Sequence, residues 1–233
     1  MAAIDCARAI LKYVKDVEKA VTFVAIAGAE SGWRKDACGD CIGGTWSCWC
    51  ATKGARCTSW GPWQVHVSAH YPWLKDLAGS ADPCTIANWL TANYENNALA
   101  AYTVYRRAGN SFCPWTTYEK WCSPRHNGRY RDFLPQARAA VQEAIILDEK
   151  QRCIAQGGTW DEANRRCIMP PPPSPPPIEA GIPILAALGA VAFGGAGIGL
   201  IAFAQRERIG NFLQKTGIIK PGGERYVSRW RSP

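Results

Sequence analysis

Residues 20–33 read AVTFVAIAGAESGW, and this stretch decides the fold expected for the N-terminal part of the chain. Its first ten residues are almost wholly apolar, as expected of a helix that is buried on all sides. Upstream, apolar side chains recur at helical spacing, which predicts one helix from about Cys6 to Ala29 with Asp5 as its N-cap. Gly32 follows as the stop signal. The sequence therefore predicts a mainly α domain built around a central buried helix.

Glu30 ends this apolar stretch and is the first candidate for chemistry. Burial disfavours a carboxylate, and the negative end of the helix dipole disfavours it further. Both effects raise the pKa, which is the condition that a general acid needs near neutral pH. The alternative is an ordinary solvated glutamate at a helix end.

The rest of the domain shows weaker patterns. Residues 34–60 are rich in Gly, Cys and Trp without a clear period, which predicts an irregular insert of loops or short hairpins. Evidence for strands is sparse elsewhere. Further helices are expected at Ser68–Leu77, Cys84–Ala108 and Asp132–Gln151.

Eleven cysteines are a high count for 233 residues and indicate either disulfides or a metal site. A zinc site in the insert would use thiolates from the set Cys38, Cys41, Cys48, Cys50 and Cys57. Disulfides are favoured, because the spacing is shorter than in common zinc ribbons and the cluster holds no His. We expect Cys153 and Cys167 to staple a small terminal hairpin and Cys6 to stay unpaired.

Charge divides the chain into segments. Its net charge is +8, and residues 205–233 carry seven basic and two acidic residues. Ala180–Ala204 is uncharged and long enough to cross a bilayer, and a proline-rich spacer precedes it. A buried core helix is the alternative reading of this run. The expected segments are a catalytic domain, a Cys-stapled hairpin, a linker, a transmembrane helix and a basic tail, at 1–150, 151–168, 169–178, 179–204 and 205–233.

The basic tail predicts that the C-terminus stays on the inner side of the membrane. The N-terminal 177 residues would then lie across it, although Lys12, Lys15, Asp16 and Glu18 interrupt any apolar export signal. A virion membrane would accommodate this arrangement. We therefore expect a virion membrane protein whose catalytic domain faces the cell wall.

Four motifs occur in a characteristic order: ESGW at 30–33, SWGPWQVH at 59–66, YENNALAAYTVYRRAG at 94–109, and WTTYEKW at 115–121 with NGRYRDFL at 127–134. This set resembles the lysozyme-like lytic transglycosylases of the SLT and goose-type superfamily, and in particular the peptidoglycan-degrading enzymes of membrane-containing bacteriophage virions. The resemblance covers roughly residues 18–140. It implies an α+β lysozyme-like fold for the mainly α domain.

The resemblance implies one catalytic carboxylate, Glu30. That residue would cleave the MurNAc-GlcNAc β-1,4 bond of peptidoglycan and leave a 1,6-anhydro product. Gln64 and nearby backbone would orient the sugar, Tyr118 or Tyr130 would hold the Glu or the sugar, and Trp33, Trp60 and Trp63 would stack on sugar faces. The implied substrate-binding residues are Ser31, Gly61, Trp63, Gln64, Asn97, Tyr118 and Tyr130.

Two other functions stay open. Asp36 or Asp40 in the insert can supply a second carboxylate, which would make the enzyme a hydrolytic lysozyme. A peptidoglycan-binding structural protein of the virion would need no catalytic acid. We expect no cofactor and no metal, since His66, His70 and His126 lack the spacing of a zinc protease. The expected partners are glycan strands, a lipid membrane at residues 180–204 and other virion proteins, without specific nucleic-acid recognition.

Overall fold

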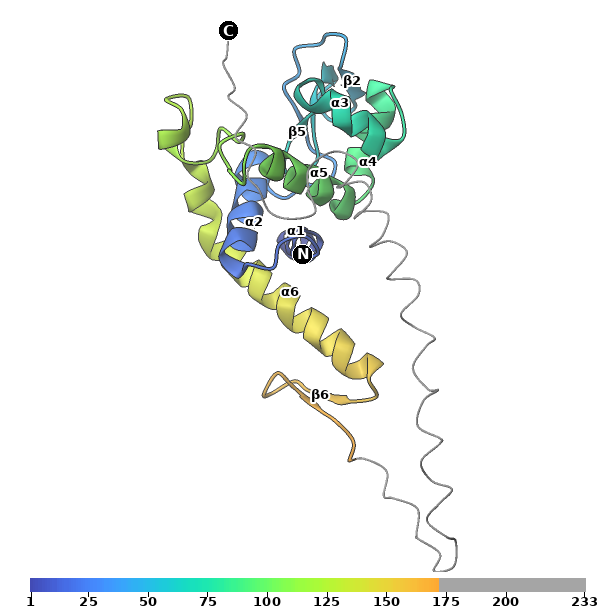
Figure 1. The fold of residues 1–233 in the computed structure, drawn as a ribbon, viewed down its shortest axis with the longest axis vertical. Helices are drawn as coiled ribbons and strands as arrows, with labels where there is room; N and C mark the ends of the chain where they lie inside the picture. Colours follow the sequence, from blue (N-terminus) through green and yellow to red (C-terminus); the bar gives the residue numbers. More distant parts are fainter. Residues whose placement is uncertain (172–233) are drawn as a thin grey trace, which may run out of the picture. The chain divides into compact units, whose positions relative to one another are not determined.

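The computed structural model describes residues 1–171, of which Met1–Pro170 form one compact unit (Figure 1). About 53% of the described residues are helical, which confirms the mainly α class. The expected transmembrane helix, the basic tail and most of the proline-rich linker lie outside the described residues. Within residues 1–171, no helix has the length and apolar character needed to cross a membrane. The helices are α1 (Ala2–Leu11), α2 (Val17–Ser31), α3 (Val67–Ala78), α4 (Pro83–Ala92), α5 (Tyr94–Arg107), η1 (Lys120–Cys122), η2 (Arg129–Phe133) and α6 (Leu134–Ala155).

Two of the expected long helices are each broken in two. The helix expected from Cys6 to Ala29 is α1 and α2, because the Asp16 side chain accepts a hydrogen bond from the Lys19 amide (3.1 Å) and starts a new helix there. The helix expected from Cys84 to Ala108 is α4 and α5. There Asn93 has extended backbone (φ −154°), and its side chain caps α5 at the Asn96 amide.

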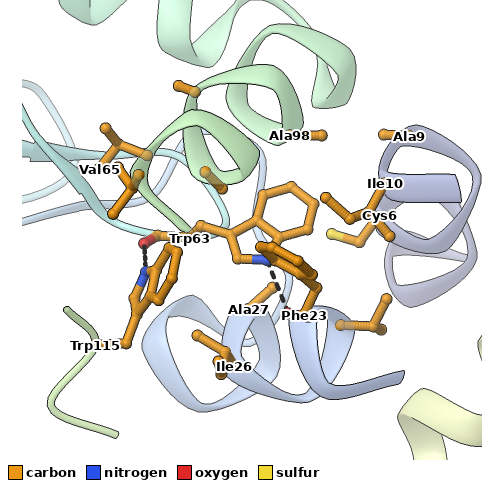
Figure 2. Close-up of a cluster of buried hydrophobic side chains, with 14 of the residues drawn as sticks. Cys6, Ala9, Ile10, Phe23, Ile26, Ala27, Trp63, Val65, Ala98 and Trp115 are labelled. Carbon is orange, nitrogen blue, oxygen red and sulfur yellow. Dashed lines mark hydrogen bonds between the residues drawn. The ribbon is translucent and has the colours of Figure 1, made fainter. Parts of the chain in front are cut away.

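Helix α2 lies at the centre of the unit, packed against α1, α6 and η2 (Figure 1). Ten of its fifteen residues are buried, which confirms the prediction from its apolar sequence. Aromatic side chains pack against α2 around Phe23, and Figure 2 shows Trp63 among them. Phe23 meets Trp115 and Phe112 edge to face, with ring centroids 6.0 and 4.8 Å apart.

The insert consists of short antiparallel strands, contains two disulfides and is joined to α4 by a third. One sheet has the order β1-β4-β5, from β1 (Cys38–Gly39), β4 (Ser59–Trp60) and β5 (Val65–His66). A hairpin pairs β2 (Cys48–Cys50) with β3 (Ala55–Cys57). The disulfide bonds of the described chain are Cys38–Cys50, Cys41–Cys57, Cys48–Cys84, Cys113–Cys122 and Cys153–Cys167.

The terminal hairpin is formed by β6 (Thr159–Asp161) and β7 (Arg166–Ile168). The disulfide Cys153–Cys167 ties it to the end of α6, as predicted. Cys6 is buried and unpaired, which confirms the second expectation from the cysteine count.

Candidate active site

Glu30 lies in the last turn of α2, where the buried helix reaches the surface. The helix ends because Gly32 adopts a left-handed backbone conformation (φ 65°). The next residue, Trp33, is left-handed as well (φ 62°). The indole of Trp33 then folds back and donates a hydrogen bond to the carbonyl of Val24 (2.8 Å). Ala29 is buried whereas Glu30 is partly exposed, so the carboxyl group stands at the boundary between core and solvent.

Thr117 holds this carboxyl group. Its hydroxyl donates a hydrogen bond to Glu30 Oε1 (2.7 Å), and its side chain is buried. Burial is the largest effect and raises the pKa of Glu30, and the negative charge of Asp40 raises it too. The Thr117 hydrogen bond and the positive charge of Arg129 lower it. The net pKa is raised, as predicted from the apolar surroundings. The group can therefore keep its proton at higher pH than an ordinary glutamate.

A second segment, Gly61–Gln64, is fixed against α5 by Asn97. The Asn97 side chain is fully buried, accepts from the Trp63 amide (3.0 Å) and donates to the Trp60 carbonyl (2.9 Å). A side chain at Gly61 would lie about 2.2 Å from Asn97, and its φ is 76°, so only glycine fits. Two of the four sequence motifs, SWGPWQVH and YENNALAAYTVYRRAG, therefore contact each other through Asn97.

Trp63 and Asn97 are structural, which corrects their prediction as substrate-binding residues. Trp63 is completely buried and donates from its indole to the Phe23 carbonyl (2.7 Å), while its own carbonyl accepts from the Trp115 indole (2.9 Å; Figure 2). Asn97 uses its amide on the Gly61–Gln64 segment. Neither side chain has a surface left for a sugar.

Gln64 lies over β1 and next to Asp40. Its amide donates to the Gly61 carbonyl (2.8 Å), and its Oε1 occupies the space that a side chain at Gly39 would need. Asp40 follows Gly39 with a left-handed φ of 51°, and its carboxylate accepts a hydrogen bond from the Ser59 hydroxyl. Asp36 and Asp40 are both exposed, and the negative charge of Asp40 is among the causes that raise the pKa of Glu30.

In the part of the chain that the structure describes, neither predicted tyrosine makes a hydrogen bond to the Glu30 carboxyl group. Tyr130 donates its hydroxyl to Glu119 (2.5 Å) and packs against Tyr118, with ring centroids 4.9 Å apart. Burial raises the pKa of both phenols. The residue that holds Glu30 is the neighbour Thr117, which the sequence analysis missed. The segment WTTYEKW was part of the resemblance and contains Thr117, but only its tyrosine, Tyr118, was predicted to hold Glu30.

The remaining predicted residues are placed as follows. Ser31 donates its hydroxyl to the Ala27 carbonyl (3.0 Å), within its own helix. Trp60 is buried, and Trp33 is partly buried with its ring edge against Phe133. A cavity of about 720 Å³ lies between α1, α5 and α6 and is lined by none of the predicted site residues.

The cysteine cluster of the insert has the proximity of a metal site but is oxidised. The sulfurs of Cys38, Cys50 and Cys57 lie within 4.8 Å of one another. All three are bonded in disulfides, and a disulfide sulfur is no thiolate ligand. The structure thus favours the disulfide alternative.

Two of the three histidines have structural contacts: His66 with Thr58 and His70 with the ring of Trp73. His66 caps α3 and bonds Thr58 (3.1 Å), and burial lowers the pKa of His70 to about 4. His126 is buried as well.

Comparisons of the chain with protein-family models, with curated proteins and with solved structures each gave no match. Any functional conclusion therefore rests on the residues of the site. That site combines a held carboxyl group of raised pKa, a nearby carboxylate and an amide side chain. This is a set able to donate a proton and orient a polar substrate.

Proposed function

We propose that the protein is a membrane-anchored lytic transglycosylase that cleaves peptidoglycan with Glu30 as its single catalytic acid. The observation that carries the proposal is the Glu30 carboxyl group itself. It stands at the end of a buried helix, has a raised pKa and is held by Thr117. A buried carboxyl group costs stability, which favours a chemical role for Glu30 over a structural one.

The proposed reaction needs one proton carrier. Protonated Glu30 gives its proton to the glycosidic oxygen as the bond from that oxygen to C1 of the sugar breaks. The Glu30 carboxylate then takes the proton of the sugar's own 6-hydroxyl, whose oxygen bonds to C1 and closes the anhydro ring. Water is neither consumed nor released, and Glu30 ends protonated for the next turnover.

In this proposal Gln64 orients the substrate. Its side chain lies between the Gly61 carbonyl and β1, the strand that Asp40 follows. An amide can pair with an N-acetyl or hydroxyl group through its donor and its acceptor. Gln64 therefore serves as the polar contact for the sugar in this proposal.

A second candidate is hydrolysis with Asp40 as general base. The specific observation in its favour is that the negative charge of Asp40 raises the pKa of Glu30, so the two carboxyl groups interact electrostatically. A pair of carboxyl groups, one protonated and one ionised, is the arrangement that glycoside hydrolysis uses. Asp40 is favoured over Asp36 for this role.

The deciding experiment is mass spectrometry of fragments that the full chain, in detergent, releases from purified peptidoglycan. Fragments one water lighter than hydrolysis products, absent with Glu30→Gln, support the transglycosylase. Full-mass fragments that disappear with Asp40→Asn but not with Asp36→Asn support the hydrolase. An oxidised, folded sample that binds peptidoglycan but releases nothing points to a binding protein and contradicts both.

The membrane anchor and the virion setting belong to the same proposal. Residues 180–204 are uncharged and the following residues are basic, as expected of a span with an inner basic tail. The five disulfides of the described chain support an oxidising location for the catalytic unit. A virion that opens the cell wall during genome entry meets both conditions.

A further inference from the structure

Trp121 is the most exposed tryptophan of the described chain and borders a pocket. Its exposed fraction is 74%. The pocket has a volume of about 430 Å³ and is lined by Glu119, Lys120, Trp121, Asn127, Gly128, Arg131 and Asp132. Single exposed apolar side chains are common on protein surfaces; this one borders a pocket with a polar lining, which offers a ligand an apolar face and polar groups together.

The indole is held in place from two sides. Trp121 lies in η1, directly before Cys122, which is bonded to Cys113. Its ring meets Tyr118 edge to face, with centroids 6.4 Å apart, and Tyr118 in turn packs on Tyr130. The disulfide fixes the backbone beside Trp121 and Tyr118 contacts its ring, and both reduce the conformational entropy that the indole loses when a ligand stacks on it.

The polar lining offers both donors and acceptors. Glu119 is fixed by Tyr130 (2.5 Å) and Arg131 (2.5 Å), and Asn127 accepts the Arg129 amide through Oδ1 (2.9 Å). The Asn127 side-chain NH₂ remains able to donate. In residues 1–171, neither Lys120 nor Asp132 has a side-chain hydrogen bond or ion pair, so both can pair with a ligand. Indole beside amide, carboxylate and ammonium groups suits a sugar, whose ring has an apolar face and hydroxyls at its edge.

The pocket residues belong to two paired segments that also carry Thr117 and Arg129. The amides of Asn127, Gly128 and Tyr130 donate to the carbonyls of residues 116, 118 and 117, respectively, at 2.9–3.0 Å. Thr117 bonds Glu30 from the same segment, and Arg129 is close enough to lower the pKa of Glu30. The segment that holds the Glu30 carboxyl group thus also forms one side of the Trp121 pocket.

We infer that Trp121 and its pocket form a distal sugar subsite that stacks an N-acetylated sugar of a long glycan strand, away from the bond that is cleaved. The inference rests on the proposed function, because the sugar it places on Trp121 belongs to the glycan strand that Glu30 is proposed to cleave. It assigns no chemistry to the pocket. Trp121 binds the strand and thereby favours long strands over short ones.

The test is calorimetric titration of the full chain, as the inactive Glu30→Gln variant in detergent, with chitohexaose and chitobiose. Adding Trp121→Ala is expected to weaken chitohexaose binding about tenfold and to leave chitobiose binding unchanged, whereas Trp121→Phe retains most of the affinity. Trp49→Ala is the matched control. Trp49 is also exposed (59%) and lies between two disulfide-bonded cysteines, but it borders none of the pocket residues.

Three results would overturn the subsite: equal chitohexaose affinity with and without the Trp121 indole, an equal loss from Trp49→Ala, or no binding of chitohexaose. A soluble stem tripeptide is titrated in parallel, and a loss of peptide affinity alone would assign the pocket to the peptide and also reject the inference. Fragment release from peptidoglycan by the unsubstituted chain is measured separately. Cleavage by a chain whose Trp121→Ala variant binds normally would retain the proposed function and reject only the subsite.

Discussion

At the scale of single residues, Thr117 is the contact that distinguishes Glu30 from a solvated carboxylate. Replacing Thr117 with Val removes the 2.7 Å hydrogen bond, and we expect kcat on peptidoglycan to fall about tenfold with little change in KM. The hydrogen bond lowers the pKa of Glu30, so its loss raises that pKa. The alkaline limb of the pH profile of kcat/KM should therefore move to higher pH.

Thr116→Val is the matched control, because Thr116 is exposed and adjacent. It should change neither kcat nor the pH profile. If Thr117→Val lowers activity without moving the alkaline limb, Thr117 supports the loop and does not position the acid.

The raised pKa of Glu30 predicts how the stability of the fold depends on pH. Its folded-state pKa is raised mainly by burial, so its favourable contribution is complete below the unfolded pKa of about 4.3 and is lost as pH rises through the folded pKa. Glu30→Gln should therefore raise the melting temperature by a few degrees at neutral pH and by less in acid. Calorimetry across pH measures this difference.

Glu119→Gln gives the opposite trend and serves as the comparison. Its pKa is lowered by hydrogen bonds from Arg131 and Tyr130, so its stabilising effect is present at neutral pH and lost as pH falls. A Glu30→Gln difference that shows the same pH trend as Glu119→Gln would contradict the raised pKa of Glu30.

Residue by residue, sequence reasoning predicted the features that depend on local context. The raised pKa of Glu30 followed from its apolar helix, and the helix end at Gly32 followed from the position of that glycine. Trp63 and Asn97 were misjudged because their use depends on a contact between segments 34 residues apart. Once Asn97 fixes the Gly61–Gln64 segment, the Trp63 indole points to Phe23 and not to solvent.

At the scale of elements, the break between α1 and α2 depends on one cap. Asp16→Ala should lower the free energy of unfolding by about 1 kcal/mol, measured by urea denaturation, because it leaves the Lys19 amide without its acceptor. Asp16→Asn should retain most of that stability. Asp5→Ala is the decisive control: Asp5 lies inside α1 and provides no cap. A larger effect at Asp5 would support a single helix.

The insert is joined to the helical part by Cys48–Cys84, across 36 residues of sequence. Replacing both cysteines with Ser should cost about 2–4 kcal/mol of stability and reduce peptidoglycan cleavage, since β1 and β4 carry the contacts of Asp40 and Gln64. Cys153→Ser with Cys167→Ser should spare cleavage, because that hairpin lies at the end of α6. Equal losses of activity in both double variants would argue against the insert as a wall of the site.

The element breaks were hard to predict because apolar periodicity continues through them. Val14 is buried in the turn before α2, so the apolar pattern gives no sign that the backbone changes direction there. Asp16 and Asn93 are polar residues within predicted helices, and their capping role depends on where the chain turns. The irregular insert was predicted from composition, but its strand register was not, because two- and three-residue strands have no period.

At the scale of the whole molecule, the proposal joins a catalytic unit to a membrane through residues 171–233. We expect the full chain to float with anionic lipid vesicles in a density gradient and to resist extraction by high salt and alkaline carbonate. The physical reason is the uncharged run Ala180–Ala204, whose burial in lipid is not sensitive to salt. A chain ending at Pro170 should stay with the soluble fraction.

Replacing both Leu185 and Leu188 with Arg provides the matched control, because it keeps the length of the segment and the basic tail. Two charges within a span are costly in the bilayer, so this variant should lose carbonate-resistant binding. If it binds as before but high salt removes it, the tail is held by charge alone. If the unsubstituted full chain is itself removed by salt, the anchor is wrong and the catalytic unit would have to reach the cell wall by another route.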